Sequence, residues 1–254
     1  MERKIDLEQI YRIEKTYHDS IASEQKGLAD IGRYELESWS YIIEVIGDLN
    51  GKKILDVGCG FGRESILMAE KGAVVTGIDI SPKSIEVAKM HAKKRRVDIN
   101  FQIGNAENMG FLNAFDIVLC RASLHHLPQV RNAIMESFKA LKFNGIFICQ
   151  EPKAENPIAV LGRKYIFKPS TTEHPFKYGE LESMTSDIFG NINTKYFCLL
   201  SPIYFGFRKI GLPTLGDICF DVLNRIDNLL LASKILHRYS WLVVIWAIKY
   251  YDDS

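Results

Sequence analysis

The sequence predicts an α/β protein with a doubly wound, mostly parallel sheet covered by helices on both faces. Two observations predict this fold. Five short apolar runs, all within residues 53–150, alternate with segments of helical periodicity, the pattern of repeated strand–helix units. The first run ends in a glycine-rich turn that opens a helix, as at the ligand-binding end of an open parallel sheet.

Each expected element has a local signal. Ile10, Ile13 and Tyr17 recur near helical spacing in the first segment, and Ser81-Pro82 reads as an N-cap followed by proline at the first helical position. The short β-branched runs bounded by glycine are typical of buried strands. In order, we expect helices at 5–25 and 33–49, a strand at 53–57, a helix at 63–71, a strand at 73–80, a helix from 81, strands at 99–103 and 115–120, a helix at about 129–142 and a strand at 145–150.

The regular alternation ends after residue 150. Residues 151–178 contain half of the eight prolines, which favours an irregular connection with one short helix. Two further strands are expected at 193–200 and 241–248, with a helical pattern at 215–236 between them. These two strands bring the expected total to seven.

Composition excludes several classes of protein. With 47% hydrophobic and 25% charged residues, the chain is an ordinary globular protein and not a disordered one. A net charge of +1 gives no basic face for nucleic acid. Five dispersed cysteines form neither a disulfide framework nor a zinc motif, so no metal is expected. The polar N-terminus and the absence of a long apolar run indicate a cytoplasmic protein with no membrane-spanning segment.

The glycine-rich turn discriminates between two ligand classes. It reads Asp56-Val57-Gly58-Cys59-Gly60-Phe61-Gly62. A dinucleotide fingerprint counted from Gly58 requires glycine at position 63, where the sequence has Arg63. The turn therefore does not fit a pyrophosphate site of that type, but its glycines still allow close approach of a ligand to the backbone.

The string LDVGCGFG resembles the first motif of the class I S-adenosylmethionine-dependent methyltransferases, of the small-molecule, methyltransferase domain 11/25-like type. The similarity continues in order and at the usual spacing, through GIDIS, GNAE, FDIV with SLHHL, and LKFNG, over about residues 50–152. It implies a Rossmann-like sheet of seven strands with an antiparallel last strand. It also implies a single methyltransferase domain with an N-terminal helical lid (1–49), a cofactor-binding core (50–152), and a substrate cap with the last two strands (153–254).

The resemblance also implies how S-adenosylmethionine is bound. Asp79 would accept hydrogen bonds from both ribose hydroxyls, Ile80 would face the adenine, and the glycine turn would hold the methionine part. Asn105 stands where relatives more often have Asp, but an amide oxygen still accepts from the adenine amino group. The implied cofactor-binding residues are Asp56, Gly58, Cys59, Gly60, Asp79, Ile80, Asn105, Ala106 and Arg121.

Candidate catalytic residues follow the fourth strand and lie on the first helix. Methyl transfer to a hydroxyl requires alignment and a base, and histidine suits that role near neutral pH. His126 is slightly preferred over its neighbour His125, and Tyr17 is a candidate lid contact. His18 and His174 rank lower. The alternative is that the histidine pair and Tyr17 have only structural roles.

The acceptor stays open at this stage. The first hypothesis is an oxygen of a small metabolite, natural product or sugar; the second is a quinone, sterol or other lipid; the third is a non-catalytic module that binds the cofactor. Aromatic side chains after residue 150, such as Tyr165, Phe176 and Phe205, suit an apolar or flat acceptor but also suit a core. The amphipathic segment 215–236 allows peripheral membrane contact, although its polar face is not rich in lysine.

Overall fold

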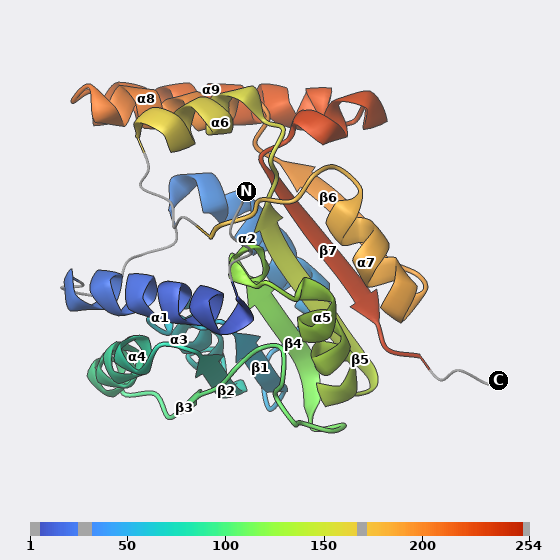
Figure 1. Cartoon of the computed structure of the whole chain (residues 1–254). Coiled ribbons are helices and arrows are strands. Elements are labelled where there is room, and N and C mark those ends of the chain that lie inside the picture. The colour runs from blue at the N-terminus through green and yellow to red at the C-terminus, as the bar shows by residue number, and fades with distance from the viewer. Residues whose placement is uncertain (1–5, 25–31, 167–171, 251–254) are drawn as a thin grey trace.

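A mixed sheet organises the computed structural model, which describes residues 6–24, 32–166 and 172–250. Its strands within these ranges pair in the order β3-β2-β1-β4-β5-β7-β6 (Figure 1). Only β7 runs antiparallel to its neighbours, so the expected sheet is confirmed. The strands are β1 (Lys53–Val57), β2 (Val74–Asp79), β3 (Asn100–Ile103), β4 (Phe115–Arg121), β5 (Leu141–Pro152), β6 (Asn193–Phe197) and β7 (Leu242–Ile248).

Alternation along each strand divides the core between the two faces of the sheet. In β1, Leu55 and Val57 join the cluster under α5 (Val130–Ala140) and α7 (Glu180–Phe189). Ile54 points to the other face, where α2 (Leu36–Ile46) and α3 (Arg63–Ala69) pack. Because both faces are covered, the central strands are apolar on both sides, which explains their continuous hydrophobic runs.

The remaining helices lie at the edges of this core. The first, α1 (Leu7–Glu24), packs beside α4 (Pro82–Arg95), whose N-cap Ser81 accepts a hydrogen bond from the Ser84 amide. The others form a separate layer beyond one end of the sheet (Figure 1). We call this layer the cap; it comprises α6 (Pro157–Tyr165), α8 (Tyr204–Lys209), α9 (Pro213–Leu230) and the 3₁₀ helix η4 (Lys234–Tyr239).

Several element boundaries differ from the expectation. The helix expected to reach residue 142 ends at Ala140, and β5 begins at Leu141, four residues before the expected start. Leu141 already pairs with Phe115, and a register shift follows, with Asn144 at φ 56°. Likewise, β6 ends at Phe197 because Cys198 adopts φ 61°. The segment expected to form one helix at 215–236 is an α-helix followed by η4.

Two buried side chains fasten the cap to the core. Asn156 caps α6 and donates to the carbonyl oxygens of Cys198, Leu199 and Tyr239. The Asp227 carboxylate of α9 accepts three hydrogen bonds, from the backbone amides of residues 199–201. Among the described helices, none has the length and apolar character needed to cross a bilayer.

Candidate active site

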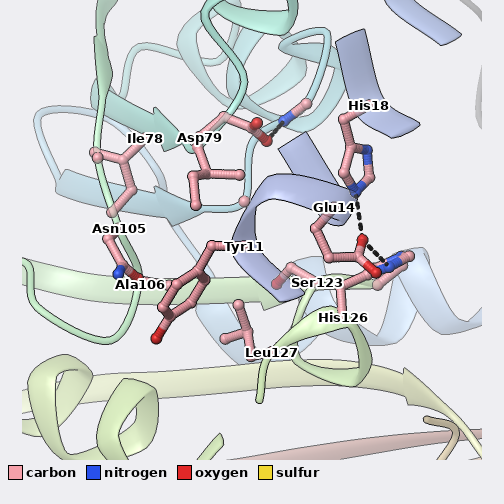
Figure 2. A pocket seen from close by; sticks show the side chains of 15 residues that line it. Tyr11, Glu14, His18, Ile78, Asp79, Asn105, Ala106, Ser123, His126 and Leu127 are labelled. Atoms are coloured by element: carbon pink, nitrogen blue, oxygen red, sulfur yellow. Dashed lines mark hydrogen bonds and ion pairs between the residues drawn. The ribbon is translucent and has the colours of Figure 1, made fainter. Parts of the chain in front are cut away.

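A pocket lies at the carboxyl ends of the first four strands, beneath α1 (Figure 2). The core contributes the glycine turn after β1, the end of β2 and the loops after β3 and β4, while α1 covers the opening with three polar side chains. The lining residues are Tyr11, Glu14, His18, Gly58, Gly60, Ile78, Asp79, Ile80, Gly104, Asn105, Ala106, Ala122, Ser123, His126 and Leu127. Six of the nine cofactor-binding residues predicted from the sequence thus line one cavity.

The glycine turn brings its backbone to the floor of the pocket. Gly58 and Gly60 have φ of 72° and 51°, a region that side chains disfavour. A Cβ on Gly58 would lie only 2.4 Å from the Cβ of Ser123, whereas one on Gly60 would meet nothing within 4 Å. The amides of Gly58 and Cys59 both donate to the Ile78 carbonyl, which fixes the turn against β2.

Asp79 ends β2 with its carboxylate at the pocket wall. Its Oδ2 accepts from the Gly60 amide and its Oδ1 from the Ser81 amide, each at 2.9 Å. A carboxylate oxygen has two acceptor sites, so each oxygen retains capacity for a hydroxyl donor. Across the pocket, the Asn105 side-chain oxygen accepts from the Glu107 amide at 2.9 Å.

Three predicted cofactor residues lie outside this pocket. Asp56 is buried and accepts a hydrogen bond from Ser65 at 2.5 Å; burial, followed by the nearby Glu64, raises the pKa of its carboxyl to about 7. Cys59 is buried in the core between α3 and α4. Arg121 is buried beneath the second cavity described below, where it forms ion pairs with Glu35 and Glu64.

The two histidines after β4 have different partners. His125 Nδ1 lies 2.6 Å from Oε2 of Glu151, a fully buried residue of β5. The same carboxylate accepts the amides of Ser123 and Leu124, which holds the turn in place. His126 Nδ1 instead lies 3.0 Å from Oε2 of Glu14 on α1.

Glu14 and His126 form a charged–neutral pair. Burial alone would raise the pKa of Glu14, but hydrogen bonds from His126, His18 and Thr172 hold it well below its ordinary value. Burial lowers the pKa of His126, with the neighbouring His125 and His18 acting in the same direction. A neutral His126 next to an ionised Glu14 agrees with both pKa directions.

A second cavity of about 530 Å³ adjoins the first. Ala122 lines both, so the two cavities meet just past the end of β4. His125 lines the second cavity and His126 the first, with their ring centroids 4.2 Å apart. The second cavity is lined by Tyr17, Tyr34, Glu35, Ala122, His125, Gln150, Pro152, Arg163, Ile166, Glu173, Pro175, Trp241 and Leu242.

Aromatic rings form much of the second cavity's wall. Tyr34 stacks on Trp241 with ring centroids 5.2 Å apart. Tyr17, the predicted lid contact, enters the same wall from α1. His174 does not line either cavity, but its neighbour Glu173 does, with Oε1 at 3.9 Å from His125 Nε2 and 3.8 Å from His126 Nε2.

Metal-ligating groups gather at this junction although the sequence predicts no metal. Glu14, His18 and His126 bring one ligand atom each within 4.8 Å of one another, and His125, His126 and Glu173 do the same. No motif spacing reveals these groups because their members lie on α1, after β4 and after residue 171. In each group, the contacts between histidine and glutamate also orient the histidine rings without a metal ion.

Sequence reasoning missed Glu14 and Glu151. Both act as acceptors for histidine, yet each is far from its partner in the sequence: 112 residues separate Glu14 from His126 and 26 separate Glu151 from His125. The one available signal is that Glu14 and His18 are four residues apart and share a helix face. Tyr11, which donates to Glu107 across the pocket, carries no sequence signal.

A glycine-rich turn after β1, an acid at the end of β2 and a lidded pocket across the parallel strands define the class of Rossmann-like enzymes that bind a nucleoside cofactor. Residues 48–196 match the family model of the methyltransferase domain. The chain belongs to this family and is an S-adenosylmethionine-dependent methyltransferase.

Curated relatives agree with this assignment. The chain is 41% identical over 123 residues to a ubiquinone biosynthesis O-methyltransferase of Pelagibacter ubique, covering 47% of this chain and 51% of the relative. It is 35% identical over 170 residues to the enzyme of that name from Bordetella avium, which covers 63% of this chain and 69% of the relative. The chain thus spans about half to two thirds of these relatives.

The likeness to solved structures concerns the fold alone. The magnesium protoporphyrin IX methyltransferase of Synechocystis, solved with bound S-adenosylhomocysteine, superposes with a TM-score of 0.64 at 17% identity, covering 94% of this chain and 99% of that one. A Haemonchus contortus phosphoethanolamine N-methyltransferase gives 0.65 at 17% identity, covering 95% and 60%.

Proposed function

We propose that this enzyme transfers a methyl group to a hydroxyl oxygen of an aromatic, quinol-like small molecule. The observation that carries the proposal is the meeting of the two cavities at Ala122, with one histidine facing each. The first cavity suits a nucleoside, and the second, walled by Tyr17, Tyr34 and Trp241, suits a flat acceptor. The curated relatives are named for O-methylation in ubiquinone biosynthesis, which supports the same acceptor class.

The residues of the first cavity fit S-adenosylmethionine. Asp79 retains acceptor sites for the ribose hydroxyls, and Ile80 and Ala106 supply apolar surface for the adenine. Gly58 lies so close to Ser123 that a side chain would not fit between them, while Gly60 is open on its Cβ side. The turn therefore presents backbone, not side chains, to the methionine part.

Asp56 and Arg121 act behind this surface in our proposal. Asp56 holds the glycine turn through Ser65 on α3. Arg121 positions Glu35 and Gln150, both of which line the second cavity, through an ion pair and a hydrogen bond. Cys59 packs beneath the turn. These three residues therefore support the site without lining the cofactor pocket.

His125 is the proposed general base. When bound, S-adenosylmethionine supplies an electrophilic methyl group on a sulfonium. Glu151 accepts the Nδ1 proton of His125, so Nε2, which lies 3.9 Å from Glu173 Oε1, is the atom that takes the proton of the acceptor hydroxyl in the second cavity. Methyl transfer would join that oxygen to the methyl carbon and release the cofactor's sulfur as a thioether, and His125 Nε2 would hold the proton that the hydroxyl loses. The geometry thus favours His125 over His126, the residue preferred from the sequence.

Calorimetry and a labelled-methyl assay test this proposal. Wild type is expected to bind S-adenosylmethionine, and Asp79→Ala to bind at least about tenfold more weakly, because the ribose loses its charged acceptor. Asp48→Ala, at an exposed position outside the pocket, is the matched control. Transfer of labelled methyl to a water-soluble catechol would support the acceptor class, and labelling only of non-aromatic acceptors would exclude it.

A further inference from the structure

A row of large apolar side chains is exposed along α9. Leu215, Ile218, Val222, Ile226 and Leu229 are between 38% and 78% exposed. Their spacing of three or four residues places them on one face of the helix. We call these five residues the α9 stripe. Such a row on a surface helix marks an interaction site more often than chance exposure.

The α9 stripe faces away from the rest of the protein. The buried residues of this helix are Gly216, Phe220 and Asp227, which share the opposite face. A Cβ on Gly216 would lie only 3.1 Å from the Cβ of Phe207 on α8, so the two helices pack closely here. The Asp227 carboxylate accepts backbone amides of the segment after β6. The inward face of α9 is thus fully used in packing, so the α9 stripe has no role in holding the cap together.

On α9 and the elements next to it, cations without an ion-pair partner outnumber such carboxylates, of which Glu37 accepts a hydrogen bond from Asn228 of α9. Every acidic residue of α9 has a partner within the protein: Asp217 pairs with Arg208, Asp221 with Arg33, and Asp227 with backbone amides. Three basic residues of this region are exposed and form no ion pair with any described residue, namely Lys209, Arg225 and Lys234. The sequence therefore understates the positive character of this surface.

An apolar groove connects this layer with the acceptor cavity. It lies between α6 and α8, has a volume of about 160 Å³, and has walls such as Ile158, Leu161 and Phe205. Ile166 and Trp241 line both the groove and the second cavity. Its outer residues are themselves exposed, with Leu161 at 59% and Ile203 at 44%.

We propose that the cap docks peripherally on an anionic lipid bilayer through the α9 stripe, and that the groove admits the apolar part of a membrane-dissolved acceptor. An interfacial helix needs an apolar face for the acyl boundary and cations for anionic headgroups, and α9 with its neighbours offers both. A bilayer also requires no shape complementarity, which suits a single aliphatic row. The docking stands on the surface alone, whereas the route for the acceptor rests on the proposed function.

Vesicle flotation tests the docking. Wild type is expected to float with vesicles of 70% phosphatidylcholine and 30% phosphatidylglycerol, and to bind phosphatidylcholine alone about 100-fold more weakly, since the three basic residues near an anionic surface add about 1 kcal/mol each and about 1.4 kcal/mol is tenfold. The variant Ile218→Ser/Val222→Ser/Leu229→Ser should lose binding to both. Met90→Ser, which replaces a 53% exposed apolar residue of α4, is the matched control and should float as wild type does.

Two further measurements decide between occupants and separate the two proposals. If light scattering shows a dimer that depends on the α9 stripe and vesicles are not bound, the stripe is an interface with a second copy and the bilayer docking is overturned. Flotation of the triple variant equal to that of wild type would also overturn the docking, because the stripe would then not contact the bilayer. The triple variant should keep wild-type cofactor affinity and activity on a soluble catechol. Vesicle binding without catechol methylation would leave the docking intact and reject only the acceptor proposal.

Discussion

Two neighbouring histidines differ in what orients them. His125 is held by Glu151, a core residue of β5 whose carboxylate also fixes the preceding turn. His126 is held by Glu14, a residue of α1. Because β5 lies inside the sheet between β4 and β7, the His125 pair does not depend on the position of α1. This difference supports our proposal that His125 is the general base, whereas the orientation of His126 depends on the position of α1.

Replacing His125 should affect turnover far more than binding. We expect His125→Ala to lower kcat by about 10²–10⁴-fold, the usual contribution of a placed base, with cofactor affinity unchanged by calorimetry. Glu151→Gln should also lower kcat, since the neutral amide is a weaker acceptor for the Nδ1 proton and orients the imidazole less firmly. His126→Ala is the matched comparison; a larger loss of kcat there than in His125→Ala would refute the assignment of His125.

Gly58 and Gly51 allow a paired test of the cofactor turn. Both have φ of 72°, so alanine at either position should cost about 1–2 kcal/mol of backbone strain. Only at Gly58 does the new Cβ collide with Ser123 in the pocket; at Gly51 it meets nothing within 4 Å. We expect Gly58→Ala to lose more stability than Gly51→Ala in urea unfolding, because the clash with Ser123 adds to the shared backbone strain, and only Gly58→Ala to lose cofactor affinity. Equal cofactor affinity in the two variants would contradict the role of the turn.

At the scale of elements, α1 is joined to the core mainly by polar side chains. Tyr11 donates to Glu107, Glu14 contacts His126, and Ser81 donates to Asp19 at 2.5 Å. Tyr11, Glu14 and His126 all line the cofactor pocket (Figure 2). Since individual polar contacts add only modest free energy, we propose that α1 opens for cofactor exchange and closes afterwards.

Glu14→Gln tests this lid. The pKa of Glu14 is lowered in the folded protein, so its stabilising contribution is fully present above the ordinary value of about 4.3 and is lost as pH falls toward the lower, folded value. We expect the variant to be less stable than wild type at pH 7, with the difference shrinking below about pH 4. Hydrogen exchange of the α1 amides measures this difference in stability between Glu14→Gln and wild type. Glu8→Gln, at an exposed position of the same helix, is the control. A pH-independent difference would contradict the lid contact.

The sequence predicted the elements well and their mutual contacts poorly. Strands such as β1 and β2 follow from local apolar runs, and the Gly58 turn and Asp79 follow from a motif of contiguous residues. The contacts of Glu14 and Glu151 depend on tertiary packing, which no local pattern encodes. The early start of β5 at Leu141 likewise depends on pairing with β4, since Leu141 follows a helix without a glycine or proline to mark the boundary.

At the scale of the whole molecule, Lys153 joins the catalytic core to the cap. It follows β5, is 1% exposed, and donates from Nζ to the His237 carbonyl of η4 at 2.8 Å. Its ammonium also lies 4.3 Å from the ring centroid of Tyr178 and 4.9 Å from that of Tyr196. Burial lowers the pKa of Lys153 to about 8, so the folded protein holds this charge at a cost.

The pH dependence of stability should reveal that buried charge. Between pH 8 and about 10.4, the ordinary lysine pKa, the unfolded chain binds the proton more strongly than the folded one, so this group makes stability rise with pH. From pH 7 to 9 we expect wild type to gain roughly 1 kcal/mol relative to Lys153→Met in urea unfolding. Lys89→Met, at an exposed position of α4, should track wild type across the range. If the free energy of unfolding of wild type relative to Lys153→Met instead falls with pH, the folded protein stabilises the Lys153 cation. The hydrogen bond to His237 and the two tyrosine rings would then outweigh the cost of burying the charge.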